Sequence, residues 1–124
     1  MKRSSKILIL ASVIVLLLSA CSTSKDKLLN RQYHRITAHY NAWWNGNQAL
    51  KEAIKTLDKA HKDDFTNILP IYKLGTAENV NNIKANTDRA IEKGSKVIKK
   101  HSMKFSGVEK NPQIDDAYLL IGKA

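Results

Sequence analysis

The chain has 124 residues, a length that suits one domain, and its 21 Lys and Arg against 11 Asp and Glu give a formal net charge of +10. Three cations, Lys2, Arg3 and Lys6, precede the processing site described below, so the mature chain carries 18 minus 11, or +7. With only 5 Gly and 2 Pro, and with much of the apolar content in the first twenty residues, the composition excludes a turn-rich β-sandwich, disfavours a large enzyme core and favours an all-α fold.

The first twenty residues predict a lipoprotein signal peptide. Three cations in residues 1–6 precede twelve apolar or small residues, 7–18. At about 1.5 Å each, twelve helical residues cover little more than half of the roughly 30 Å of bilayer hydrocarbon, so the segment predicts a secretory signal rather than a span. Leu18-Ser19-Ala20-Cys21 resembles the lipobox of bacterial lipoproteins, in which the cysteine is acylated and becomes the new N-terminus. Cys21 is the only cysteine and is the predicted lipid anchor.

Residues 21–27 form a polar tether whose composition bears on location. Ser22 stands where an Asp would resemble an inner-membrane retention signal, and residues 22–27 lack the acidic run that resembles a surface-export signal. The sequence therefore predicts a lipid-anchored protein of the outer membrane that faces the periplasm.

Apolar periodicity predicts a helical hairpin over residues 28–61. Asn45-Gly46-Asn47 is the expected break, since Asn or Gly ends helices and Asn47 can cap the next one. The expected apolar faces recur at helical spacing: Leu29, Tyr33, Ile36, Tyr40 and Trp43 before the break, and Ala49, Leu50, Ala53, Ile54, Leu57 and Ala60 after it.

The rest of the chain predicts two further helices. Residues 65–72, around Pro70, form a linker, and Thr76 starts a third helix that runs to about His101. A loop with Gly107 follows, and Asn111-Pro112 starts the last helix. The third helix is expected to have one apolar face, formed by Val80, Ile83, Thr87, Ala90, Ile91, Gly94, Val97 and Ile98.

The last helix also matches part of a tetratricopeptide pattern. Tyr118, Ile121 and Gly122 have the spacing of a large residue followed by Leu-Gly, and Gly122 would allow close approach of a paired helix. Ala53, Leu57 and Ala60 have second-helix spacing, although any antiparallel bundle shows such small residues. Because the sequence stops at Ala124, inside this helix, we expect an incomplete repeat region over 28–124 that leaves Tyr118, Leu119 and Ile121 without a packing partner.

Five blocks follow one another in a recognisable order: Cys21-Ser22-Thr23, Tyr40-Asn41-Ala42-Trp43-Trp44-Asn45-Gly46-Asn47, Ile68-Leu69-Pro70, Lys99-Lys100-His101-Ser102 and residues 111–124. This order resembles the N-terminal portion of the PorW/SprE family, tetratricopeptide lipoproteins of Bacteroidetes associated with type IX secretion and gliding motility. The resemblance covers essentially the whole mature chain. It implies a scaffold at the periplasmic side of the outer membrane, with no catalytic residues.

No pattern of chemistry-bearing residues predicts catalysis or a cofactor. His34 and His39 are five residues apart and do not share a helix face as metal ligands would, whereas His61 and His101 suit solvated positions near helix ends. The pairs Asp63-Asp64 and Asp115-Asp116 suit capping and solubility, and the dispersed glycines make no phosphate loop. We expect no enzyme, cofactor, metal, nucleic-acid partner or small-molecule substrate.

Two features suggest partner contact. In Trp43-Trp44 one ring must face a partner helix, and the other is either exposed for a partner or lies at the hairpin edge. A basic stripe lies beside the apolar face of the third helix and consists of Lys93, Lys96, Lys99, Lys100 and Lys104. It is either a solvated face or a contact with acidic lipid headgroups or an acidic partner.

The function expected from these observations is a protein-interaction scaffold of the secretion and gliding machinery, with other envelope proteins as partners. A tetratricopeptide lipoprotein of outer-membrane protein assembly, resembling BamD, is the alternative. An envelope hydrolase is a third class, for which no constellation of acid, base and nucleophile is found in the sequence.

Overall fold

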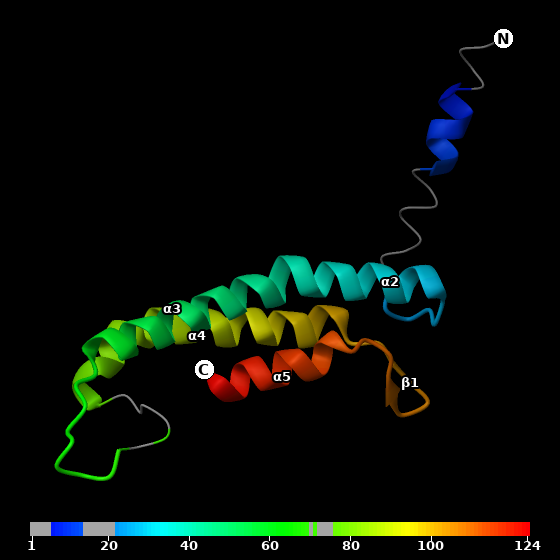
Figure 1. Ribbon diagram of the computed structural model, residues 1–124. Helices are drawn as coiled ribbons and strands as arrows, with labels where there is room; N and C mark the ends of the chain where they lie inside the picture. Colours follow the sequence, from blue (N-terminus) through cyan, green and yellow to red (C-terminus); the bar gives the residue numbers. More distant parts are fainter. Residues whose placement is uncertain (1–5, 14–21, 70, 72–75) are drawn as a thin grey trace.

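The computed structural model describes residues 6–13, 22–69, 71 and 76–124, which are mostly helical, and so confirms the all-α class. Residues 6–13 are helical and are drawn apart from the bundle (Figure 1). The bundle consists of α2 (Leu28–Thr37), the π-helix η1 (Ala38–Trp43), α3 (Trp44–Ala60), α4 (Ala77–His101) and α5 (Gln113–Lys123). Over the described ranges, no helix combines the length and the apolar composition needed to cross a bilayer.

The predicted hairpin over 28–61 is wrong, because α2, η1 and α3 follow one another without a break from Leu28 to Ala60. Asn45 does not end a helix, since its side-chain amide donates to the carbonyl of Asn41 at 2.6 Å. Gly46 is buried where α3 meets α4 and α5, and a Cβ there would lie 2.8 Å from Leu120 Cδ2 and 2.9 Å from Lys93 Cβ. The glycine thus permits close helix packing rather than a turn.

The predicted inward face is wrong for the first half of this long helix, whereas Ala49, Leu50 and Ala53 in its second half are buried as predicted. Leu29, Tyr33, Ile36 and Tyr40 are exposed. The opposite side, which is buried, carries small or polar side chains: Asn30, His34, Ala38, Ala42, Gly46, Ala49 and Ala53, with Leu50 the one large apolar residue among them. Small side chains let the neighbouring helix approach closely, so the bulky residues lie outside.

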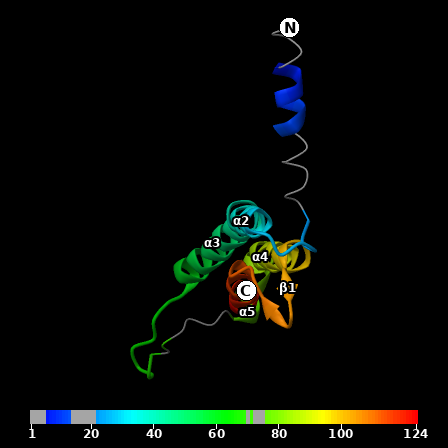
Figure 2. The same cartoon turned by 90° about the vertical axis from the view of Figure 1, so that its right-hand side faces the viewer.

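The predicted third and last helices are confirmed by α4 and α5. Of the predicted linker over 65–72, residues 65–69 and 71 are non-helical, and Pro70 and Tyr72 lie outside the described residues. α4 runs back along α3, and α5 reverses direction again and contacts α4, α3 and η1 (Figure 1). Figure 2 shows the long helix of α2, η1 and α3 packed with α4 and α5 in a triangular arrangement. Two small apolar clusters hold them together: Ala38, Ala42, Val97, Ile114 and Ala117 in one, and Ala49, Leu50, Ala90 and Leu120 in the other.

The connection between α4 and α5 contains a small hairpin that the sequence did not reveal. β1 (Lys104–Phe105) pairs antiparallel with β2 (Val108–Glu109), and the turn places Ser106 and Gly107 at φ of 50° and 80°. Two-residue turns of this kind favour glycine because both central residues have positive φ. The expected loop with Gly107 is therefore a tight hairpin.

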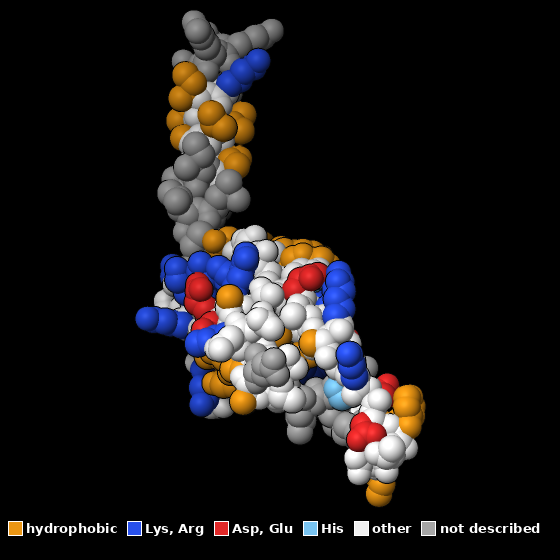
Figure 3. Space-filling model, turned by 90° about the vertical axis from the view of Figure 1, so that its left-hand side faces the viewer, with side chains coloured by type: hydrophobic (Ala, Val, Ile, Leu, Met, Phe, Trp, Pro, Cys, Tyr) orange, Lys and Arg blue, Asp and Glu red, His pale blue; other side chains and the backbone are white. Residues whose placement is uncertain are grey.

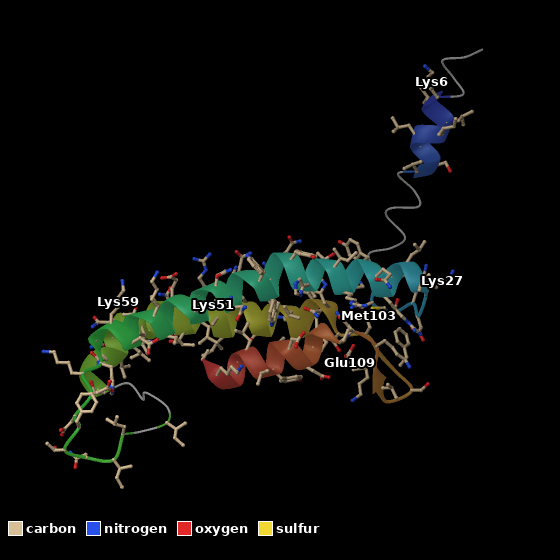
Figure 4. The ribbon with its side chains drawn as sticks, viewed as in Figure 1. Lys6, Lys27, Lys51, Lys59, Met103 and Glu109 are labelled. Carbon is tan, nitrogen blue, oxygen red and sulfur yellow. The ribbon has the colours of Figure 1, made fainter. Side chains whose placement is uncertain are left out.

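Glu109 fixes this hairpin to the start of α5. Its carboxylate accepts hydrogen bonds from Ser102 Oγ at 2.6 Å, the Met103 amide at 2.8 Å and the Asn111 amide at 2.9 Å. Met103 and Glu109 lie together at the junction of α4 and α5 (Figure 4). Asn111 caps α5 as predicted, because its side-chain oxygen accepts from the Gln113 amide at 3.1 Å.

We expect Glu109→Ala to lower the free energy of unfolding by about 2 kcal/mol, since it leaves buried donors without an acceptor. Burial alone would raise the pKa of Glu109, but hydrogen bonds from Ser102 and nearby backbone amides hold this pKa below its ordinary 4.5. The carboxylate thus stabilises the fold above about pH 4.5, and this contribution is lost as the pH falls through the lower folded-state pKa. Urea unfolding at pH 7 and pH 3 measures the loss of stability in Glu109→Ala and the pH dependence of the wild type. Glu109→Gln should remove the part of that pH dependence which comes from the carboxylate. An unchanged pH dependence in Glu109→Gln would show that Glu109 does not contribute to it.

Candidate interaction surfaces

The structure brings two histidines together that the sequence placed far apart. His34 of α2 is buried, and its Nδ1 lies 3.0 Å from Nδ1 of His101 at the end of α4. One ring must donate and the other accept, so this contact requires at least one neutral ring. The expected solvated role of His101 is wrong, because the helix end is packed against α2.

Burial is the main reason why the pKa of His101 lies below its ordinary 6.5, and the charges of His34, Lys100 and Lys96 lower it further. His34 and His39 do lie apart as expected, because His39 bonds through Nδ1 to Gln113 Oε1 at 2.7 Å and stacks on Trp43. His61 pairs with Asp63 at 3.0 Å. Within the described part of the chain, no three His, Cys, Asp or Glu side chains gather as metal ligands.

The two tryptophans have different surroundings, as the sequence predicted for adjacent helical residues. Trp43 packs against both apolar clusters and donates from Nε1 to the Asp116 carbonyl at 3.3 Å. Trp44 is 46% exposed. The π-helix contributes to this difference, because its wider turn inserts a residue and shifts the register of everything after it.

Trp44 extends the exposed side chains of α2 and η1 into one line. We call Leu29, Tyr33, Ile36, Tyr40 and Trp44 the outer row; their exposed fractions run from 38% to 69%. Figure 3 shows hydrophobic side chains gathered along the upper edge of the bundle, with Lys and Arg groups on either side. The sequence revealed the periodicity of four of these residues, but periodicity cannot distinguish a core face from an exposed one.

An open groove of about 320 Å³ adjoins the outer row. Ile36 and Tyr40 form its apolar wall, and Arg35, His39, Gln32 and Gln113 supply polar groups. The groove therefore offers a cation and hydrogen-bonding groups directly beside apolar surface.

The outer face of α5 is a second apolar surface, on which Tyr118 and Leu119 are exposed as expected. Ile121 was expected to lack a partner, but it is half-buried, and a Cβ at Gly94 would lie 2.7 Å from its Cγ1. Gly122 was expected at a close helix contact, yet a Cβ there would meet nothing within 4 Å among the described residues.

The remaining predicted sites have separate positions. Lys96 and Lys100 are exposed on α4, so they stay available as a basic surface. Cys21 lies outside the described residues, whereas its neighbour Ser22 is described: the Ser22 carbonyl accepts from Asn30 Nδ2 at 2.7 Å. The tether is thus held against α2.

The fold and these surfaces define a small antiparallel helical protein with two exposed apolar faces. No protein-family model matches the chain, and no curated protein matches it.

Proposed function

We propose that the protein is an outer-membrane-anchored lipoprotein that faces the periplasm and acts as a helical-repeat scaffold for protein interaction in type IX secretion and gliding motility. The lipobox ending at Cys21 supports the anchor, and the block order that resembles the PorW/SprE family supports the machinery.

The observation that carries the scaffold is the outer face of α5. α3, α4 and α5 pack one against the next in alternating directions, an arrangement that helical-repeat arrays share with other antiparallel bundles. α5 then presents Tyr118 and Leu119 to solvent beside the half-buried ring of Trp43. Such a face suits another helix or an envelope protein.

Co-purification from cells tests the scaffold. The protein is isolated from membranes with its bound envelope proteins, as wild type and as Leu119→Ser, with Ile54→Ser, an exposed residue of α3, as control. Loss of a secretion component from Leu119→Ser alone supports the proposal. Recovery of outer-membrane assembly components instead would favour the BamD-like alternative, and recovery of no envelope protein would contradict the scaffold.

Cys21→Ala tests the anchor. We expect this change to abolish labelling by radioactive palmitate and to leave an unprocessed or soluble product, because no other cysteine can be acylated. Cys21→Ser serves as a second variant of similar size. Label still incorporated into either variant would contradict the lipoprotein assignment.

A further inference from the structure

We infer that the outer row lies against an anionic lipid surface, so that the long helix from Leu28 to Ala60 docks lengthwise on the membrane that holds the anchor. This inference rests on the proposed acylation of Cys21. It assigns to the outer row a lipid partner, distinct from the protein partner proposed for α5.

The chemistry of the outer row suits the interface between lipid and water. Two tyrosines and a tryptophan accompany one leucine and one isoleucine, and Tyr and Trp gather at membrane interfaces because each ring has an apolar body and a polar tip. From Leu29 to Trp44 the row extends about 22 Å along the helix. An apolar line on one face of an otherwise polar helix is typical of helices that lie in the interface plane.

Charge along the same segment suits an anionic leaflet. Between Asp26 and Glu52 the sequence contains no Asp or Glu, and its cations there are Lys27, Arg31, Arg35 and Lys51. The guanidinium of Arg35 lines the groove whose other wall is Ile36 and Tyr40. A lipid phosphate in this groove would meet a cation while the acyl chains meet the outer row.

The tether brings the anchor to the same helix. The hydrogen bond from Asn30 to Ser22 holds the chain at the first turn of α2, and Asp26 pairs with Arg31. The acyl chains proposed on the residue before Ser22 would therefore enter the bilayer close to the first turn of α2, which keeps the helix that carries the outer row near the lipid.

The two tryptophans provide the test, since the chain has no others. Trp43→Phe leaves Trp44 as the reporter, and Trp44→Phe leaves Trp43. The processed, acylated protein is placed in vesicles of phosphatidylethanolamine and phosphatidylglycerol that carry brominated acyl chains. We expect Trp44 emission to be quenched at least about threefold more strongly than Trp43 emission, because only Trp44 faces the bromine atoms.

A matched pair of variants distinguishes the effect of a tyrosine in the outer row from that of an exposed tyrosine elsewhere. Tyr40 in the row is 66% exposed and Tyr118 on α5 is 60% exposed. In the Trp43→Phe background, Tyr40→Ser should reduce Trp44 quenching about twofold, whereas Tyr118→Ser should leave it unchanged. Replacing phosphatidylglycerol by phosphatidylcholine should also weaken the quenching.

Flotation of the vesicles separates docking from anchoring. Protein that floats while Trp44 stays unquenched would overturn docking and leave the anchor intact. Protein that does not float would overturn both. Unquenched Trp44 together with loss of an envelope protein from Tyr40→Ser would show that the outer row is a protein contact, which also overturns the inference.

Discussion

Gly46→Val is expected to lower the free energy of unfolding by about 3 kcal/mol. A Cβ at this position would lie 2.9 Å from Lys93 Cβ, an atom that cannot move without its backbone, and 3.4 Å from the Ala90 carbonyl oxygen. The added side chain must therefore push α3 away from α4. For a chain of this size the midpoint of thermal unfolding should fall by roughly 10 to 20 °C, measured by circular dichroism.

Gly122→Val is the matched control. A Cβ at Gly122 meets nothing within 4 Å of the described chain, and valine is no worse than glycine in a helix. We expect its stability to differ from wild type by less than about 0.5 kcal/mol. Equal losses from both variants would show that the cost is local to the backbone and not a helix contact.

Trp43→Ala is expected to cost about 3 kcal/mol in the free energy of unfolding. The ring packs against both apolar clusters, and few other large side chains fill the space between η1, α3 and α5. Removing it deprives both clusters of these contacts and leaves Leu50 and Leu120, which line the same hollow, more exposed to water. Urea denaturation of purified protein measures the loss directly.

Trp44→Ala uses the neighbouring residue as the control. Because this ring is exposed, its removal should change stability by less than about 0.5 kcal/mol. A loss comparable to that of Trp43→Ala would place both rings in the core and would also contradict the membrane contact inferred for the outer row.

The helix start at Asn111-Pro112 could be predicted because capping and proline chemistry is local. The third helix also starts at Thr76 as predicted, although the Thr76 side chain makes no capping hydrogen bond. That the helix continues through Gly46 could not be predicted, since glycine suits both a helix end and a close contact between helices. Only the packing of α4 and α5 against Gly46 shows that it serves the close contact. Likewise the four residues of the outer row before Trp44 were predicted to lie in the core, because a periodic apolar face shows that a helix is amphipathic but not what covers that face.

Contacts between distant residues were beyond the reach of sequence patterns. Nothing in the sequence joins His34 to His101, and the network around Glu109 depends on a two-residue turn whose first central residue is a serine. Among the predicted interaction residues, the distinction between one inward and one exposed tryptophan was foreseeable from helical geometry. Whether Trp43 or Trp44 faces inward depends on how η1 shifts the helical register of the residues that follow it.

The small and polar buried face of the long helix has a consequence for the order of folding and modification under the export proposed for this chain. Alanines, Asn30 and His34 give this helix little apolar area to bury by itself, and the helix that covers them begins only at Ala77. In an exported chain the N-terminal end emerges first, so residues 22–60 arrive well before α4. Under the proposed acylation of Cys21, the segment next to it would therefore stay open to acylating and processing enzymes until α4 has emerged, and the bundle would fold after that modification.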